Sequence, residues 1–238
     1  MKLKLILSLL MTLVFVTAGF SQVKEHETNS AVPELVKFHE VIYQIWHTAW
    51  PEKDVKMLKS LLPEVEKSYK ELSGAKLPGI LREKKAKWDE GMKKLTASYE
   101  AYKTAAGKDD AQPLLDAAEK LHANYEGLVR TIRPVLKEVD AFHQDLYMLY
   151  HYYVDKYDFS KIKKSSSALS SKMDAMKKAQ LSEKQKTKKE AYDKAVAELE
   201  KAVKEFAAVV KAGDNKEKVK AAVETVHTKY QAVEAVFN

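Results

Sequence analysis

Two stretches of the chain, VKFHEVIYQIWHTAWPEKD at residues 36–54 and DAFHQDLYMLYHYYVDKYD at residues 140–158, follow one pattern at a spacing of 104 residues. Both carry a Phe-His pair, a tyrosine, a second histidine and an aspartate at matching positions. The matched pairs are Phe38 with Phe142, His39 with His143, Tyr43 with Tyr147, His47 with His151 and Asp54 with Asp158. Self-similarity at a fixed period indicates an internal duplication.

The duplication continues through the rest of both copies. At the same spacing Leu77 matches Leu181, Asp89 matches Asp193 and Leu95 matches Leu199. After a one-residue insertion near Gly107 the matched pairs are Asp109 with Asp214, Glu119 with Glu224, His122 with His227 and Tyr125 with Tyr230. Six of the seven histidines therefore occur in both copies, and only His26, near the N-terminus, has no counterpart.

Each copy divides into four stretches of helical pattern. Seven glycines and six prolines in 238 residues are too few for a turn-rich β-protein. The first copy predicts helices at 33–50, 54–73, 79–106 and 110–131, and the second at 134–155, 159–177, 182–212 and 215–237. Short connections imply antiparallel neighbours. The predicted fold is all-α, with two tandem up-down-up-down four-helix bundles.

Apolar residues at helical spacing mark the face of each helix that should be buried. The predicted core positions are Leu35, Phe38, Ile42, Ile45 and Ala49, then Trp88, Met92, Leu95, Tyr99 and Tyr102, then Leu114, Ala118, Leu121, Tyr125 and Leu128, with Phe142, Leu146 and Leu149 in the second copy. Tyr43, Trp46, Trp50, Tyr147 and Tyr150 flank the histidines, and we expect them to pack between helices or between the copies.

The ends of several helices can also be predicted. Asp54, Asp158, Asp109 and Asp214 stand where helices begin, which favours an N-cap role for each. Pro33 and Pro134 fit the first helical turn, where a missing N–H costs nothing. Only Ile132 and Arg133 separate the two copies, so a nearly continuous, proline-kinked helix is expected between them.

The first residues are typical of a secretory signal peptide. Lys2 and Lys4 precede an apolar run at 5–20, and small residues then allow cleavage just before Gln22. The run is shorter than the roughly 20 residues that span a membrane. We therefore expect a signal peptide at 1–21, a leading tail at 22–32, and bundles at 33–131 and 134–238. The mature protein is expected to be periplasmic or secreted, without stable membrane insertion.

Composition excludes several classes of function. The absence of cysteine rules out disulfides, thiolate metal sites, iron–sulfur clusters and covalently attached haem. The net charge is +7, but the lysines are interleaved with glutamates at helical spacing, so we expect solvated faces and no nucleic acid partner. No Ser/His/Asp arrangement or phosphate-binding glycine loop is found, and we expect no enzyme activity.

One resemblance to a known family comes from the stretch 54–128. It carries a Lys76-Leu77-Pro78 turn, Trp88-Asp89 at the start of a helix, and the run Ala117-Ala118-Glu119-Lys120-Leu121. These motifs resemble the soluble periplasmic b-type cytochromes and their c-prime type four-helix relatives. The resemblance implies a four-helix bundle and a haem held between a methionine early in helix one and a histidine late in helix four. Here the first bundle helix has no methionine, and the helix-four histidine lies about two turns early.

The duplicated histidines suggest a metal site instead. His39 lies about six residues into the first helix and His122 about nine from the end of the fourth, so an antiparallel pair brings them to similar heights. Glu119 lies three residues before His122 and shares its face. A Glu-x-x-His pattern in a bundle helix can ligate a transition metal when other helices add ligands.

We therefore predict one metal site per copy, formed by His39, Glu119 and His122 in the first and by His143, Glu224 and His227 in the second. Two imidazoles and a carboxylate suit Zn²⁺, Cu²⁺, Ni²⁺ or Fe²⁺. Asp89 and Asp193 are weaker candidates at a similar height.

His47 and His151 form a separate case. Eight residues from His39 is about 12 Å along a helix, too far to share one ion. Both lie near helix carboxyl ends, where the helix dipole favours a partly cationic imidazole. An additional site there with Asp54 or Asp109 is an alternative.

Two alternatives to metal binding stay open. One is a non-catalytic structural or interaction protein, in which His39 and His122 hydrogen-bond each other or nearby tyrosines. The other is a b-type haem protein, which the missing methionine makes the weaker expectation.

Overall fold

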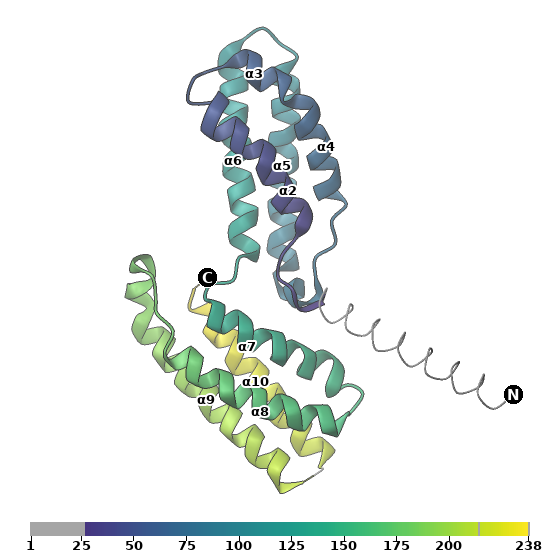
Figure 1. Ribbon diagram of the computed structural model, residues 1–238, viewed down its shortest axis with the longest axis vertical. Helices are drawn as coiled ribbons and strands as arrows, with labels where there is room; N and C mark the ends of the chain where they lie inside the picture. Colours follow the sequence, from purple (N-terminus) through teal and green to yellow (C-terminus); the bar gives the residue numbers. More distant parts are fainter. Residues whose placement is uncertain (1–26, 214, 238) are drawn as a thin grey trace, which may run out of the picture. The chain divides into compact units, whose positions relative to one another are not determined.

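A computed structural model describes residues 27–213 and 215–237, and within these residues the chain is helical without a β-strand (Figure 1). The predicted signal peptide at 1–21, most of the leading tail with His26, and Asp214 lie outside the described residues. The all-α prediction is confirmed. No helix among the described residues is long and apolar enough to cross a membrane.

The contacts divide the chain into two compact units. The first unit comprises Asn29–Arg133, and the second comprises Pro134–Asn238 together with the segment that ends at Thr28. The first unit contains α2 (Pro33–Gln44), the π-helical turn η1 (Ile45–Ala49), α3 (Val55–Ser60), α4 (Leu62–Ser73), the 3₁₀ turn η2 (Gly79–Lys84), α5 (Lys85–Ala106) and α6 (Ala111–Ile132).

The second unit repeats this order of elements. It contains α7 (Lys137–Met148), the π-helical turn η3 (Leu149–Tyr153), α8 (Phe159–Lys177), the 3₁₀ turn η4 (Glu183–Lys188), α9 (Lys189–Ala212) and α10 (Lys216–Ala235). Both π turns, both 3₁₀ turns and the starts of α5 and α9 are 104 residues apart, and α6 and α10 begin 105 residues apart. Lys53 and Tyr157, also 104 apart, share a left-handed backbone at φ 51° and 50°.

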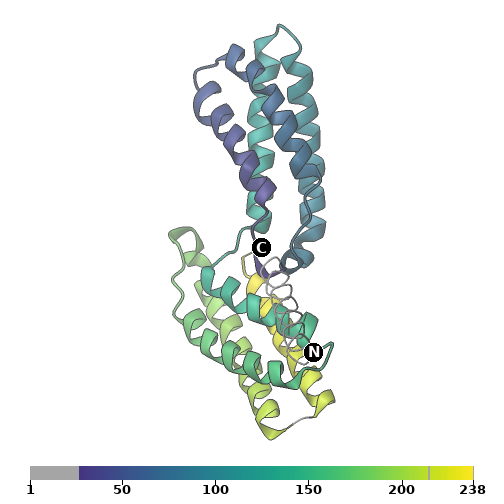
Figure 2. The same cartoon turned by 45° about the vertical axis from the view of Figure 1, so that its right-hand side comes forward.

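The helices of each unit contact one another in chain order. In the first unit α2 packs on α4, α4 on α5 and α5 on α6, and α6 returns to contact η1 and α2 (Figures 1 and 2). In the second unit the same sequence of contacts joins α7, α8, α9 and α10, and α10 returns to η3 and α7. Each unit therefore places its first and last helices side by side, which is where the duplicated histidines lie.

The predicted apolar stripes form the two cores. Every predicted core position is buried except Met92, which is half-buried. Phe38 and Phe142 are fully buried, and each contacts the edge or face of a buried tyrosine, Tyr125 at 5.9 Å and Tyr230 at 6.0 Å between ring centroids. The 3.6-residue period was sufficient to identify these faces because it follows from helix geometry alone.

Two of the predicted N-caps are confirmed and one is wrong. The Asp54 carboxylate accepts from the backbone N–H of Met57 at 2.8 Å, and that of Asp158 accepts from Lys161 at 3.1 Å. Asp109 is not a cap, because its neighbour Asp110 takes that position. The position equivalent to Asp110 in the second unit is Asn215, whose side-chain oxygen accepts from the N–H of Lys218 at 3.0 Å.

The expectation of a continuous helix between the copies is wrong. Residues 133–136 are not helical, and α7 begins at Lys137, beyond Pro134. The ring of a proline pushes the preceding residue out of the helical region, and Arg133 accordingly has φ −59° and ψ 129°. Pro33, by contrast, does occupy the first turn of α2.

Candidate functional site

The first helix of each unit carries a column of alternating imidazole and phenol rings. In the first unit Tyr43 lies between His39, at 6.1 Å between ring centroids, and His47, at 4.6 Å. In the second unit Tyr147 lies between His143, at 6.3 Å, and His151, at 4.8 Å. The duplicated residues therefore form the same column twice.

The π turns explain why these rings line up. On a regular α-helix a residue eight positions on lies about 80° around the axis. One π turn adds about one residue to the winding, which turns the following residues back by up to about 100°. The N–H of Trp50 donates to the carbonyl of Ile45 at 2.8 Å, five residues earlier, and that of Val154 donates to Leu149 at 2.9 Å. The π winding therefore brings His47 and His151 toward the faces of His39 and His143.

The histidine of the last helix is stacked on an aromatic ring in each unit. His122 on α6 lies flat against Trp46, at 4.2 Å between centroids and 5° between planes. His227 on α10 lies against Tyr150, at 4.0 Å and 14°. Trp46 and Tyr150 occupy equivalent positions, so a flat aromatic ring supports this imidazole in both units.

The last-helix histidine also lies near the histidines of the first helix. In the second unit His151 and His227 approach to 6.3 Å between centroids, with their rings nearly perpendicular. In the first unit burial lowers the pKa of His122, and the nearby imidazoles of His47 and His39 lower it further, whereas the Glu126 carboxylate opposes the shift. The three duplicated histidines of the first unit are thus close enough to interact electrostatically.

The predicted carboxylate ligands are placed differently from one another. Glu224 lies beside the second cluster, where its carboxylate accepts from the Tyr150 hydroxyl at 2.8 Å. Its counterpart Glu119 is exposed on α6. Asp89 and Asp193 are turned to lysines one turn earlier on their own helices, Lys85 and Lys189, each at 2.6 Å. These two aspartates are therefore not brought to the histidines.

His39 and His143 stack on the tyrosines of the last helix. The His39 ring lies 5.7 Å from Tyr125 and the His143 ring 4.5 Å from Tyr230, both nearly parallel. Within residues 27–213 and 215–237, no three His, Asp or Glu side chains converge into a group that could hold a metal ion. The sequence found the right histidines, but it missed their aromatic partners, although Trp46, Tyr150, Tyr125 and Tyr230 are all at duplicated positions.

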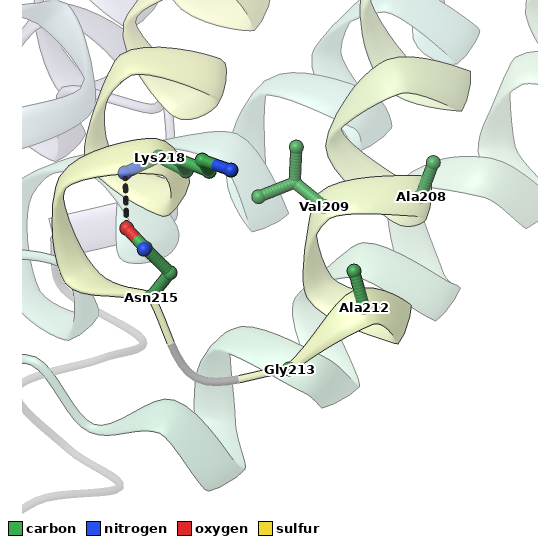
Figure 3. Close-up of a pocket in the computed structure, with 6 residues that line it drawn as sticks. All are labelled: Ala208, Val209, Ala212, Gly213, Asn215 and Lys218. Atoms are coloured by element: carbon green, nitrogen blue, oxygen red, sulfur yellow. Dashed lines mark hydrogen bonds between the residues drawn. The ribbon is translucent and has the colours of Figure 1, made fainter.

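A surface pocket lies elsewhere in the second unit, at the turn between α9 and α10 (Figure 3). It is lined by Ala208, Val209, Ala212, Gly213, Asn215 and Lys218. Asn215 and His227 are twelve residues apart near or on α10, which is about 18 Å along the axis. This pocket is therefore separate from the histidine cluster.

Comparisons with protein-family models, with curated proteins and with solved structures find no match to this chain.

The lowered pKa of His122 predicts a pH dependence of stability. The unfolded chain binds the proton at its usual pKa of 6.5, whereas the folded chain binds it only at lower pH. Unfolding therefore takes up a proton in this window, and the free energy of unfolding should fall as the pH drops below about 6.5. Urea titration at pH 7.5 and pH 5.5 measures it. His122→Phe keeps a flat ring on Trp46 but cannot titrate, so it should lose less stability on acidification than the parent; an equal loss would contradict the assignment.

Proposed function

We propose that each unit binds one divalent transition-metal ion, Zn²⁺, Cu²⁺, Ni²⁺ or Fe²⁺, and that the protein serves metal handling or sensing outside the cytoplasm. The paired imidazoles of the first and last helices, His47 with His122 and His151 with His227, form the centre of the proposed sites. Glu119 and Glu224, one turn before the last-helix histidines, would supply a carboxylate. His39 and His143 lie beyond the intervening tyrosine and are the alternative imidazole ligands.

The approach of His151 to His227 carries this proposal. Metal–nitrogen bonds of about 2.0–2.1 Å hold two imidazole centroids roughly 5–6 Å apart on one ion. The observed 6.3 Å lies just above this range, so side-chain rotation alone could close the pair. Glu224 is tied to the same cluster through Tyr150, which stacks on His227. Imidazole and carboxylate are ligands that these metals accept.

The lowered pKa of His122 supports metal binding at neutral pH. A coordinating imidazole must be neutral, and burial keeps the proton off His122 below the usual pKa of 6.5. The Trp46 ring fixes the plane of this imidazole. A ligand that is already neutral and oriented loses less free energy on binding.

We also propose the finer architecture on which this site depends, two tandem up-down-up-down four-helix bundles in an exported protein. The chain-order packing of helices in each unit, the return of the last helix to the first and the repeated element bounds support it. Each copy would then build the same site between its first and last helices.

Isothermal calorimetry with Zn²⁺, Ni²⁺ and Cu²⁺ on metal-free protein tests the proposal. We expect two ions per chain, and one ion in the variant carrying His47→Ala and His122→Ala, because only the first site is lost. Affinity should weaken as the pH falls through about 6.5, where imidazole protonates. The matched control is His39→Ala, which should keep two ions.

Three results would contradict this proposal in different ways. Unchanged stoichiometry in the His47/His122 variant would remove that pair from the site. Loss of one ion in His39→Ala alone would move the site to His39, Glu119 and His122. No binding to the parent protein, with a low-spin spectrum at two haems per chain on adding hemin, would favour the haem alternative.

The second candidate function is a non-catalytic structural or interaction protein. Its support is that all six duplicated histidines lie against aromatic rings. Rings stacked in this way rigidify a helix pair without any ligand.

A further inference from the structure

The two histidine columns differ in what covers them. Tyr43 in the first unit is 52% exposed, whereas its counterpart Tyr147 is 1% exposed. His39 and His47 are exposed, whereas His143 and His151 are half-buried. The same ring column is therefore open in the first unit and covered in the second.

One covering group of the second column is described. The Tyr147 hydroxyl donates to the Glu27 carboxylate at 2.7 Å, although the two residues are 120 positions apart. Glu27 belongs to the segment that ends at Thr28, which groups with the second unit. An acidic segment of extended sequence position thus docks on a phenol that two imidazoles flank.

The open column has the same chemistry. Val36, His39, Tyr43 and His47 form what we call the open face of the first unit. Val36 is 64% exposed, and Val36 and Tyr43 are the two large apolar side chains that stand exposed in the described part of the chain. They are seven residues apart, two turns of helix, and so lie on one stripe. The phenol hydroxyl and the imidazole N–H groups are hydrogen-bond donors that suit a carboxylate.

We propose that the open face is a docking site for an acidic segment of a partner protein, with a glutamate carboxylate that accepts from the Tyr43 hydroxyl. The chain has two such faces and one leading segment, which is engaged on the second unit through Glu27. If two copies exchanged this segment, each molecule would uncover one face for every face it covered. A foreign segment adds a contact without that loss. Glu40, also exposed on α2, would have to lie at the rim of the docked segment.

This proposal does not depend on metal binding, because Tyr43 and Val36 are outside the proposed metal ligands. The probe is a fluorescent peptide of residues 22–32, QVKEHETNSAV, whose Glu27 already bonds to Tyr147. Fluorescence anisotropy with the chain from Gln22 onward, in the presence of a chelator, should show one peptide per chain. Tyr43→Phe, which removes only the hydroxyl, should weaken the affinity about tenfold, as the loss of one charge-assisted hydrogen bond does.

The controls separate the open face from other surfaces. A peptide with Glu27→Gln should bind about tenfold more weakly to the parent and equally to Tyr43→Phe, because both changes remove one bond. Val36→Asp should weaken binding of both peptides. Tyr147→Phe should leave the one-site affinity at the open face unchanged. Circular dichroism confirms that each variant is folded before it is scored.

Two outcomes would overturn the proposal. Peptide binding that is absent, or that is equal in parent and Tyr43→Phe, would show that the open face does not take an acidic segment. A concentration-dependent dimer that Tyr43→Phe abolishes, seen by sedimentation, would assign the face to a second copy of this chain instead.

Discussion

Phe38→Ala is expected to lower the free energy of unfolding of the first unit by about 3–5 kcal/mol, the usual cost of truncating a buried phenylalanine. Phe38 is fully buried on α2 and packs edge-on against Tyr125 of α6. Its removal leaves a cavity at the contact between the first and last helices, below the histidine column. Because stabilities of single domains are only about 5–15 kcal/mol, this loss should be evident in any denaturation curve.

The chain contains its own probe for this experiment. Its three tryptophans, Trp46, Trp50 and Trp88, all lie in the first unit. Phe38→Ala should therefore move the urea midpoint of tryptophan fluorescence to lower concentration. The matched control Phe142→Ala makes the same cavity beside Tyr230 of the second unit. It should shift part of the circular dichroism transition and leave the fluorescence midpoint unchanged. A fluorescence shift of equal size in Phe142→Ala would mean that the units unfold as one.

Gly91→Ala is the second change with a large expected effect, about 1–2 kcal/mol of lost stability from overpacking. In an ordinary helix interior this substitution is stabilising. At Gly91 on α5, however, an added Cβ would lie 2.7 Å from Cδ2 of Leu128 on α6. Leu128 is fully buried, so its side chain can yield only by disturbing the core. Fluorescence-detected urea unfolding measures the loss.

The second copy indicates how to rescue this variant. The positions equivalent to Gly91 and Leu128 are Ala195 and Val233, so the smaller partner faces the larger one. The variant with Gly91→Ala and Leu128→Val should therefore be more stable than the sum of the two single losses, by about 1 kcal/mol. Additive losses would show that the two side chains do not meet in the way the structure places them.

The sequence alone was sufficient for the duplication, for the helical class and for most buried faces. Those inferences rest on period and on local chemistry, which do not depend on where other parts of the chain lie. The Asp54 and Asp158 caps are of the same kind, because a cap bonds to an N–H three residues away. Local reasoning failed where the alternatives were adjacent residues, as at Asp109 and Asp110.

Breaks in helices needed more than the apolar pattern. The predicted helix at 54–73 is divided at Leu61 into α3 and α4, whereas its counterpart α8 is continuous. Pro63 stands near the start of α4, where it cannot donate a backbone hydrogen bond, and the equivalent residue in α8 is Ser167. The apolar period runs through both helices, so it could not separate these cases.

Which histidine meets which ring was decided by the tertiary structure. The sequence placed His47 apart from His122 because it assumed regular α-helical winding through residue 50. The π turn changes that winding, and it arises where η1 and η3 pack against the last helix of each unit. Likewise, nothing in the repeated sequence distinguishes Tyr43 from Tyr147. Only one of them meets the carboxylate of Glu27, because burial depends on which distant segment of the chain comes to rest on a side chain.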